Sequence, residues 1–386
     1  MRGVSVIGIG ETKMGKYPGT LKDMIREGAE KAISDAKIDK KLIEAIYFGN
    51  FNGSFWSGQS LMGPLVAEAI GLEDLPTMRL EGACATGSLA FRQGFYSIAC
   101  GLYDVVLVGG AELMTHKSTP VITEGLASAT DVELEAKVGA TFPSLFALAA
   151  NRYFYEYGNV REEMAMAAVQ NHANACLNPD AQMHKRIDVD TVKNGFPVAY
   201  PLTVYDCSLV SDGSAFIVLA ASEIADKISG SKIVDVLGSG HGGSTIQVST
   251  KNITSFAATR NAAKEAYGMA GLKPSDIDFA EVHDCFTITQ IINIEDLGFF
   301  EKGRGARAIS EGRTALDGAI PINSSGGLKA KGHPIGATGL SQIFEVVTQL
   351  RGDAGERQIK NARIGLNHNL GGMGATCVIN IFRGRE

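Results

Sequence analysis

The stretch Glu81-Gly-Ala-Cys-Ala-Thr-Gly-Ser88 places a cysteine, Cys84, among small residues directly ahead of an apolar pattern with helical spacing. The pattern runs from residue 89 to 99 and predicts that Cys84 lies where a turn enters the first turn of a helix. Free backbone amides and the positive end of the helix dipole favour a thiolate there. Gly82 and Gly87 allow backbone and substrate to approach closely. Taken alone, the stretch fits a reactive thiol and a buried structural cysteine equally well.

Two distant segments supply possible partners for this thiol. Val282-His-Asp-Cys-Phe286 follows an apolar run that predicts a strand, and residues two apart on a strand face the same side, so His283 and Cys285 could enter one pocket. In Gly332-His-Pro-Ile-Gly-Ala-Thr-Gly339, His333 lies in a rigid turn, which suits a general base. A polar strand end and a capped histidine are the simpler interpretations of each segment alone. The conjunction of three such motifs favours a thiol nucleophile with acid–base partners.

Other sites are less well supported by the sequence. Zinc sites in proteins need two closely spaced Cys/His pairs, whereas His283 and Cys285 form a single close pair, so we predict no metal site. The glycine-rich stretch Gly238-Ser-Gly-His-Gly-Gly243 has neither the ending of a phosphate-binding loop nor the spacing of a dinucleotide fingerprint, and we predict a turn. The remaining histidines have no second reactive residue at useful spacing and are expected to be structural: His116, His172, His184 and His241.

Composition limits the class of protein. A chain of 386 residues with 45% hydrophobic residues and 46 glycines is typical of a compact α/β enzyme. The net charge of −6 and the lack of a sustained basic block argue against binding to nucleic acid or to a membrane surface. No apolar run approaches the length of a bilayer span. Six cysteines at irregular spacing, without an apolar leader, predict a reducing, cytoplasmic location.

The order of the expected elements indicates an internal duplication. Residues 1–115 with 206–228 form one predicted α/β unit and residues 229–386 form another, each with reactive residues at the ends of its elements. Residues 116–205 are less regular and polar, and predict an inserted loop domain. Strands are expected at 4–9, 45–49, 104–109, 214–219, 232–237, 277–282, 362–366 and 376–382, with helices at 21–36 and 259–270.

Six motifs together resemble those of the thiolase family, and they occur in the family's order across nearly the whole chain. They are Gly-Ala-Cys-Ala-Thr-Gly at 82–87, Val-Gly-Gly-Ala-Glu at 108–112, Asp-Cys-Ser-Leu-Val-Ser-Asp-Gly at 206–213, His-Asp-Cys-Phe at 283–286, Gly-His-Pro-Ile-Gly-Ala-Thr-Gly at 332–339 and Gly-Gly-Met-Gly at 371–374. The resemblance implies the α/β thiolase fold, a duplicated five-layer αβαβα arrangement with an inserted loop domain.

One departure from the common thiolase pattern narrows the resemblance. Most bacterial and mitochondrial thiolases have Asn-Glu-Ala-Phe where this chain has His283-Asp-Cys-Phe286, and take a second catalytic cysteine from a Cys-x-Gly near the C-terminus. Here that cysteine position is His368, in Asn367-His-Asn-Leu-Gly371. The pattern is similar to sterol-carrier-protein-type thiolases and archaeal acetoacetyl-CoA thiolases, in which the cysteine of His-Asp-Cys-Phe takes over the acid–base task.

The resemblance implies a role for each matching residue. Cys84, deprotonated by His333, would carry the acetyl group of one acetyl-CoA, and Cys285 would remove an α-proton from a second. His283 and His333 would donate to the thioester oxygen, while the backbone amides of Cys84 and of Leu370 or Gly371 would face the oxyanion of the acyl-enzyme. Coenzyme A thioesters are then substrates, with no separate cofactor. The residues implied to contact coenzyme A are Cys207, Ser208, Leu209 and Lys331.

The resemblance leaves alternatives open and implies partners. A β-ketoacyl synthase shares the fold and the Cys-His-His set but has no need of Cys285; a degradative 3-ketoacyl-CoA thiolase runs the same reaction in the other direction. A non-catalytic thiolase-like scaffold would not need the four reactive side chains. The resemblance implies a homodimer or a dimer of dimers, and the apolar strand expected at 104–109 looks suited to a two-fold interface. The archaeal enzymes also associate with a hydroxymethylglutaryl-CoA synthase, bridged by a small OB-fold protein, and so supply the mevalonate pathway of isoprenoid biosynthesis.

Overall fold

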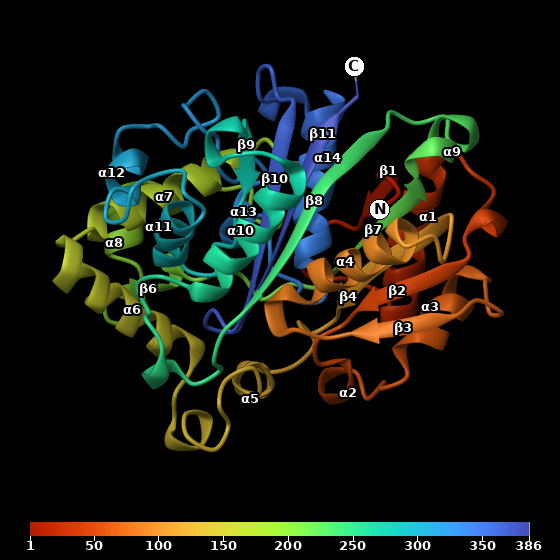
Figure 1. The fold of residues 1–386 in the computed structure, drawn as a ribbon. Helices are drawn as coiled ribbons and strands as arrows, with labels where there is room; N and C mark the ends of the chain where they lie inside the picture. The colour runs from red at the N-terminus through yellow and green to blue at the C-terminus, as the bar shows by residue number, and fades with distance from the viewer. Residues whose placement is uncertain (386) are drawn as a thin grey trace.

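The computed structural model describes residues 1–385 and is built on a mixed β-sheet. Within those residues the sheet has nine strands in the order β3-β2-β4-β7-β1-β8-β11-β10-β9 (Figure 1). The strands of the N-terminal half are β1 (Val4–Glu11), β2 (Ala45–Gly49), β3 (Thr77–Leu80), β4 (Val105–Glu112) and β7 (Gly213–Ala221). Those of the C-terminal half are β8 (Val234–Gly243), β9 (Phe279–Glu281), β10 (Ile364–Gly371) and β11 (Thr376–Gly384).

Strand pairing shows the duplication. In the N-terminal half β2 runs parallel to β4, while β4 and β1 each pair antiparallel with β7. In the C-terminal half β9 runs parallel to β10, while β10 and β8 each pair antiparallel with β11. The halves meet where β1 pairs antiparallel with β8. The same unit therefore occurs twice, as the element order predicts.

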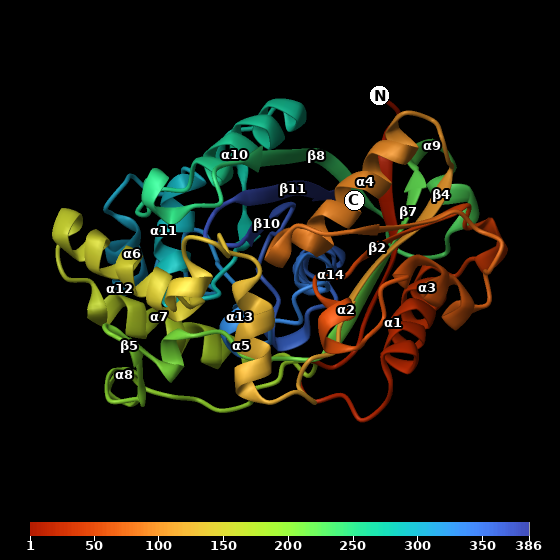
Figure 2. The same ribbon diagram turned by 90° about the horizontal axis from the view of Figure 1, so that it is seen from below.

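Helices complete five layers, as Figures 1 and 2 show. The helix α1 (Leu21–Ala36) packs on β1 and β7, and α10 (Ala257–Ala270) packs on β8 and β11. Between the halves, α4 (Thr86–Ala99) packs on β2 and β4, and α14 (Thr338–Arg351) packs on β10, on β7 and on α4. The remaining helices are α2 (Gly53–Trp56), α3 (Met62–Ile70), α5 (Thr119–Ala127), α6 (Phe142–Tyr157), α7 (Arg161–Ala175), α8 (Val189–Lys193), α9 (Ser222–Ile228), α11 (Thr287–Asp296), α12 (Gly305–Ser310) and α13 (Gly327–Ala330).

The glycine-rich stretch at 238–243 belongs to strand β8, so the predicted turn is wrong. Its glycines lie directly beneath α10: a Cβ atom on Gly240 would come within 2.0 Å of the Ala262 carbonyl oxygen. In the other half, a Cβ atom on Gly10 would come within 2.3 Å of the Ala32 amide nitrogen of α1. The glycines thus allow a helix to pack closely on the strand, at the same place in both halves.

The segment at 116–205 is more regular than predicted. It contains the helices α5 to α8 and a hairpin of β5 (Pro197–Ala199) and β6 (Leu202–Thr203). The helices α6 and α7 bury Phe146, Tyr153 and Met164 in the core of the C-terminal half. Their apolar residues recur at helical spacing, a signal that the polar stretches around them obscured. The limits of this segment as a domain stay a prediction.

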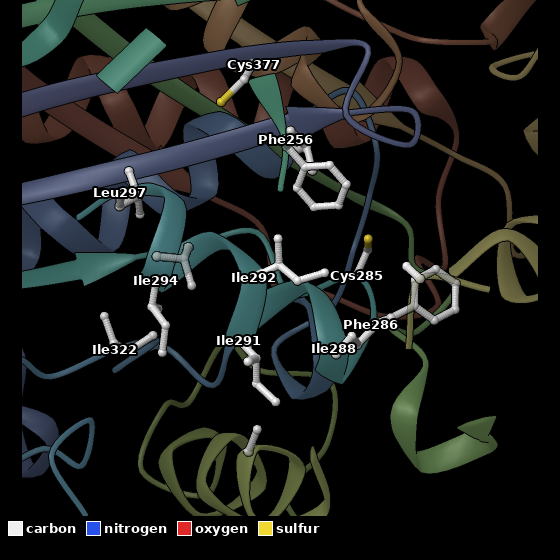
Figure 3. Packing of buried hydrophobic residues seen from close by; sticks show 14 of the residues in the cluster. Phe256, Cys285, Phe286, Ile288, Ile291, Ile292, Ile294, Leu297, Ile322 and Cys377 are labelled. Atoms are coloured by element: carbon white, nitrogen blue, oxygen red, sulfur yellow. The ribbon is translucent and has the colours of Figure 1, made fainter. Parts of the chain in front are cut away.

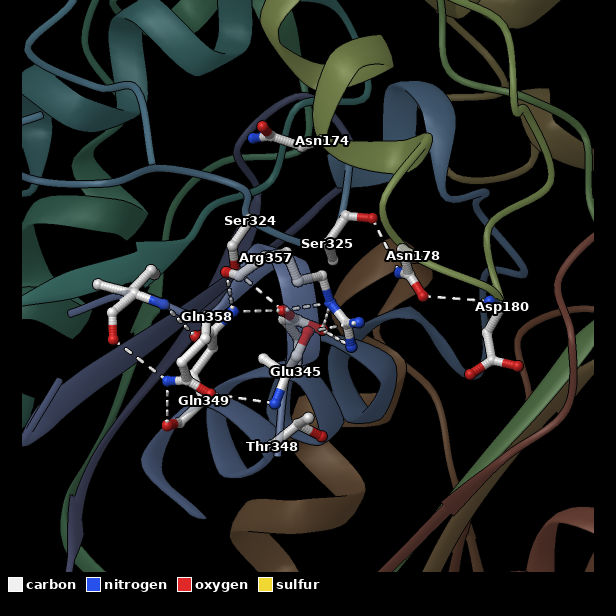
Figure 4. A network of polar contacts seen from close by, with 12 residues as sticks. Asn174, Asn178, Asp180, Ser324, Ser325, Glu345, Thr348, Gln349, Arg357 and Gln358 are labelled. Atoms are coloured by element: carbon white, nitrogen blue, oxygen red, sulfur yellow. Dashed lines mark hydrogen bonds and ion pairs between the residues drawn. The ribbon is translucent and has the colours of Figure 1, made fainter. Parts of the chain in front are cut away.

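Polar contacts fix the chain that leads to His333. The Asn178 side chain donates to the Ser325 carbonyl oxygen at 2.9 Å, and Ser324 donates to Glu345 of α14 at 3.0 Å (Figure 4). The Glu345 carboxylate also pairs with the buried Arg357 guanidinium at 3.0 Å. Because buried charges need such partners, this network anchors α14 and the residues before His333.

Two further findings bear on the sequence predictions. All six cysteines lie among the described residues, and each is a free thiol. Among residues 1–385, no helix combines the length and the apolar character that a membrane crossing requires.

Candidate active site

Cys84 lies in a single 3-10 turn, Ala83–Ala85, that leads directly into α4. Ala83 has a φ of 49°, in the left-handed region that non-glycine residues rarely adopt. Such a conformation costs about 1–3 kcal/mol and persists where the surroundings enforce it, often at functional sites. The Gly82 amide donates to the Thr86 hydroxyl at 2.9 Å and helps to hold the sharp turn. Cys84 therefore occupies the turn-to-helix position that the sequence predicts.

The structure brings Cys84 together with His283 and His333. The Cys84 Sγ atom and one ring nitrogen of each histidine all lie within 4.8 Å of one another. The two imidazole rings stand edge to face, with centroids 5.4 Å apart and an interplanar angle of 84°. Cys84 comes from the N-terminal half and both histidines from the C-terminal half, so the site lies where the halves meet.

Hydrogen bonds fix the tautomer of His333. The Thr338 hydroxyl donates to the Pro334 carbonyl oxygen at 2.9 Å, so it must accept the hydrogen bond that joins it to His333 Nδ1 at 2.7 Å. Nδ1 therefore carries the proton and Nε2 presents a lone pair. The His333 amide also donates to the Ser211 hydroxyl at 3.0 Å, which holds the backbone in place. His333 can thus accept a proton at Nε2.

His283 has the opposite tautomer. The Asn369 side-chain amide donates to His283 Nδ1 at 3.3 Å, so the proton lies on Nε2. The Nε2 atom is buried and has no hydrogen-bond partner among the described residues. A buried donor without a partner costs about 1–3 kcal/mol, and an oxygen that enters the pocket can relieve this cost. His283 is not among the residues that line the cavity at Cys84, but one of its ring nitrogens lies within 4.8 Å of the Cys84 Sγ atom. Its predicted role as a donor to a substrate oxygen stays a prediction.

His368 stands at the position where the common thiolase pattern has a cysteine, and its side chain packs behind His283. Its Nδ1 atom accepts from the His283 amide at 3.3 Å, and its Nε2 atom bonds to the Thr259 hydroxyl at 3.0 Å. The side chain is fully buried and does not line the cavity at Cys84. With both nitrogens engaged, His368 is not placed to act on a substrate.

Cys285 faces the same cavity as Cys84. It comes just before α11, followed by Phe286, as Figure 3 shows. The Cys285 Sγ atom lies 3.7 Å from the Thr289 hydroxyl, and its carbonyl oxygen accepts from the Ser208 amide at 2.8 Å. Burial and the neighbouring Cys84 raise the pKa of Cys285 well above its ordinary value. Once deprotonated, this thiol is a strong base.

The resting charge state differs from the one that the sequence predicts. Burial raises the pKa of Cys84 to about 12, although the backbone amides of Gly372 and Cys84 offset part of the rise. Burial lowers the pKa of His333 to about 3. The helix dipole therefore does not produce a free thiolate, because the desolvation that a closed pocket imposes is the larger effect. Cys84 and His333 rest as a neutral pair, and the proton must move as the sulfur attacks.

The second amide donor also differs from the prediction. Gly372 lines the cavity and directs its amide toward Cys84, whereas Leu370 and Gly371 do not line it. Those two residues pair with Cys377 and Thr376 in the ladder between β10 and β11. The predicted donors are thus displaced because strand β10 extends to Gly371, and the free amide follows in the turn.

The cavity has a volume of about 370 Å³ and a largely apolar wall. It is lined by Cys84, Cys285 and His333, by the predicted coenzyme A contacts Cys207, Ser208 and Leu209, and by Met114, Thr123, Leu126, Thr141, Phe142, Pro143, Phe146, Val198, Val210, Phe286, Ile335 and Gly372. A narrow apolar channel of this kind suits a thioester on a flexible arm. Cys207, Ser208 and Leu209 line this cavity, and their contact with coenzyme A stays a prediction.

Lys331 is not placed to meet the phosphates of coenzyme A. Its side chain is buried, and its Nζ atom forms an ion pair with Glu11 at 2.9 Å and donates to the Ser341 carbonyl oxygen at 3.3 Å. This corrects the sequence-based assignment. Lys331 lies inside the protein because nearly all of the segment at 320–351 is buried.

The same cluster has the donor types of a metal site. Cys84, His283 and His333 are the set among the described residues whose atoms lie close enough to share one ion. A thiol and two imidazoles match the preferences of zinc, and three protein ligands leave a fourth position open. A bound ion would occupy the thiol and both imidazoles, so metal binding and the predicted nucleophile and base roles of these residues exclude each other at this site.

Several residues that build the site were not identified from the sequence. Thr338 and Asn369 fix the two tautomers, and Gly372 supplies an amide. Asp206 and Asp212 anchor the channel segment between them: Asp206 pairs with Arg161 at 3.0 Å, and Asp212 accepts from the Met114 amide at 2.7 Å. All lie in or beside motifs that the sequence does show, but their roles depend on contacts between segments far apart in the chain.

Comparison with known proteins shows the family of the chain. The family described as "Thiolase, N-terminal domain" matches residues 4–223, and "Thiolase C-terminal domain-like" matches residues 238–384. The chain is 46% identical over 384 residues to an acetyl-CoA acetyltransferase of Methanothermobacter thermautotrophicus, covering 99% of this chain and 100% of that protein. Sterol carrier protein 2 of Oryctolagus cuniculus is 34% identical over 98% of this chain and 72% of that protein.

Solved structures share the fold at low sequence identity. Human mitochondrial 3-ketoacyl-CoA thiolase has a TM-score of 0.74 at 18% identity, covering 100% of this chain and 99% of that chain. An acetyl-CoA acetyltransferase from Syntrophomonas wolfei has a TM-score of 0.74 at 20% identity, covering 99% of both chains. From its fold and its matches along nearly the whole sequence, the chain belongs to the thiolase family and is an acyltransferase.

Proposed function

We propose that this enzyme condenses two molecules of acetyl-CoA to acetoacetyl-CoA and coenzyme A through an acetyl group carried on Cys84. The observation that carries the proposal is the combination of Cys84 with two histidines of opposite tautomer, all within 4.8 Å, and a second thiol, Cys285, in the same cavity. The name and 46% identity of the Methanothermobacter relative support acetyl-CoA as the substrate. No separate cofactor is needed for these steps.

In the first half-reaction, Cys84 attacks the thioester carbonyl while His333 Nε2 takes the thiol proton. Negative charge on the carbonyl oxygen is met by the amides of Cys84 and Gly372, and donors of this kind are often worth about 3 kcal/mol each. When the tetrahedral intermediate collapses, the coenzyme A sulfur leaves and takes the proton of Cys285. The products are acetyl-Cys84, a Cys285 thiolate, protonated His333 and free coenzyme A.

In the second half-reaction, the Cys285 thiolate removes an α-proton from another acetyl-CoA. The enolate oxygen then receives hydrogen bonds from His283 Nε2 and from protonated His333. The enolate carbon attacks the acetyl carbonyl on Cys84, and the released Cys84 sulfur recovers its proton from His333. Every group returns to its initial protonation state, and the raised pKa of Cys285 gives it the basicity that this step needs.

Turnover in both directions tests the proposal. Purified protein is given acetyl-CoA alone, and separately coenzyme A with acetoacetyl-CoA or with longer 3-ketoacyl-CoA. We expect acetoacetyl-CoA to form in the first assay and thiolysis of acetoacetyl-CoA to exceed that of longer substrates in the second. Preference for long substrates would instead identify a degradative 3-ketoacyl-CoA thiolase. Condensation that requires a malonyl donor would identify a β-ketoacyl synthase, and no turnover at all would leave a scaffold.

We further propose that the product passes in the cytoplasm to a hydroxymethylglutaryl-CoA synthase, through a complex bridged by a small OB-fold protein, and so enters the mevalonate pathway. Condensation of two acetyl thioesters is uphill, so useful flux needs an enzyme that consumes acetoacetyl-CoA. The proposal is tested by mixing the three proteins and measuring their size and the free acetoacetyl-CoA. Co-migration with a low level of free product is expected; separate migration with product at its uncoupled level would refute the complex.

A further inference from the structure

The motif Val108-Gly-Gly-Ala-Glu112 ends in a buried carboxylate that the proposed reaction does not use. Glu112 is the last residue of β4 and is fully buried. One of its oxygens accepts from the Phe51 amide at 2.9 Å and from the Gly336 amide at 3.1 Å. The other accepts from the Asn52 amide and the Asn50 side-chain amide, each at 3.2 Å. Both oxygens therefore have two donors. Burial raises the pKa of this carboxyl to about 7, and its backbone hydrogen bonds and the nearby Arg79 guanidinium offset part of the rise.

The contact with Gly336 crosses between the two halves. Gly336 lies in the turn that carries His333, three residues after it, while Glu112 lies in the half that carries Cys84. Glycines of the N-terminal half surround the Gly336 carbonyl oxygen: a Cβ atom on Gly110 would come within 2.2 Å of it, and one on Gly49 or Gly87 within 3.0 Å. The turn is thus inserted into a recess that has room for backbone alone.

We propose that Glu112 is a positioning residue, which holds the turn of His333 against the half that carries Cys84 and so sets the approach of the imidazole to the thiol. The inference rests on the proposed proton transfer from Cys84 to His333. Gly87, in the first turn of α4 three residues after Cys84, contacts the same Gly336 carbonyl, so the recess touches both reactive segments. A displacement of about 1 Å at such a pair can cost about 100-fold in rate.

A purely electrostatic role for Glu112 predicts the opposite change in the reactivity of Cys84. Its negative charge, with burial as the larger cause, raises the pKa of Cys84. If charge were its whole effect, Glu112→Gln would lower that pKa and make Cys84 more reactive. If Glu112 acts by holding the turn of His333, Glu112→Gln makes Cys84 less reactive. The glutamine NH2 group would then face two N–H donors, and the two hydrogen bonds at that position would be lost.

The experiment measures alkylation of Cys84 by iodoacetamide against pH, with kcat and KM for acetoacetyl-CoA. Burial raises the pKa of Glu112 to about 7, so the profile is compared between about pH 8 and about pH 9, where this carboxylate is charged. In the wild type, general-base help from His333 should give a rate that is nearly flat over that range. In Glu112→Gln we expect the flat region to disappear, the rate to follow the thiolate fraction, and kcat to fall about 10-fold to about 100-fold with KM little changed. Gly336→Ala keeps the charge and crowds the same recess, and should show the same loss.

Glu295→Gln is the control for the loss of a buried carboxylate elsewhere in the protein. Glu295 bonds to the Tyr153 hydroxyl at 2.5 Å and the Gly305 amide at 2.8 Å and pairs with Lys302 at 3.1 Å, away from the His333 turn. It should change thermal stability but keep the flat alkylation profile. Faster alkylation in Glu112→Gln, or a kcat loss equal to that of Glu295→Gln at equal loss of stability, would overturn the positioning role. A wild-type profile without a flat region would instead refute the proposed pairing of Cys84 with His333.

Discussion

Thr338 holds His333 in the tautomer that can accept a proton, and its hydroxyl can be removed with little change of shape in Thr338→Val. The Pro334 carbonyl oxygen, which the hydroxyl also contacts, still accepts from the Ala337 and Thr338 amides, each at 2.9 Å. The substitution therefore leaves one group without a partner, the buried Nδ1–H of His333. An unpaired buried donor costs about 1–3 kcal/mol, and the ring can avoid that cost only by moving the proton to Nε2.

A proton on Nε2 removes the lone pair that must accept the Cys84 proton. The unpaired Nδ1–H therefore destabilises only the reactive tautomer of His333, in which Nε2 is free. With about 1.4 kcal/mol for each factor of ten, kcat should fall about 5-fold to about 150-fold. KM should hardly change, because Thr338 does not line the cavity. The assay is thiolysis of acetoacetyl-CoA over a range of substrate concentrations, with Thr338→Ser as the control that keeps the hydroxyl. A Val variant with wild-type kcat, or equal losses in Val and Ser, would refute this explanation of the tautomer.

Three further outcomes follow from the same structure. Cys285→Ala should still become acetylated at Cys84 but should neither condense nor exchange the α-hydrogens of acetyl-CoA with deuterated solvent; condensation at an unchanged rate would assign the base to another group. Burial lowers the pKa of His368 to about 3 from an ordinary value of 6.5. Between these two pH values the unfolded chain binds a proton that the folded protein does not, so stability is lost as the pH falls below about 6.5. In His368→Gln, the slope of unfolding free energy with pH measured by urea denaturation should lose up to about 1.4 kcal/mol per pH unit; an unchanged slope would contradict the assignment. Light scattering should show at least a dimer, and a fully active monomer would remove that expectation.

The sequence predicts the fold well because its strands and helices carry strong local patterns. The buried strands at 105–112 and 213–221 are apolar almost throughout, and the helix after Cys84 has clear helical spacing. Glycines misled the prediction at 238–243, since a glycine that makes room for a helix cannot be told from one that makes a turn without knowing that α10 lies above it.

The site could be predicted only in part, for a different reason. Residue types in short motifs identified Cys84, His283, Cys285 and His333, but the charge state of the thiol depends on how deeply the folded protein buries it. Lys331 was assigned from the resemblance, and only the fold shows that Glu11, more than 300 residues away in sequence, pairs with it. The contacts of Thr338 and Asn369 likewise join side chains to histidines through the tertiary structure.

The central claim is that Cys84 carries the acetyl group. Incubation of the protein with acetyl-CoA, rapid acid quenching, proteolysis and mass spectrometry should find the mass of one acetyl group on the peptide that contains Cys84. Cys84→Ala should lose both this label and all turnover, while Cys285→Ala should keep the label. Acetylation confined to Cys285, or undiminished turnover in Cys84→Ala, would contradict the account.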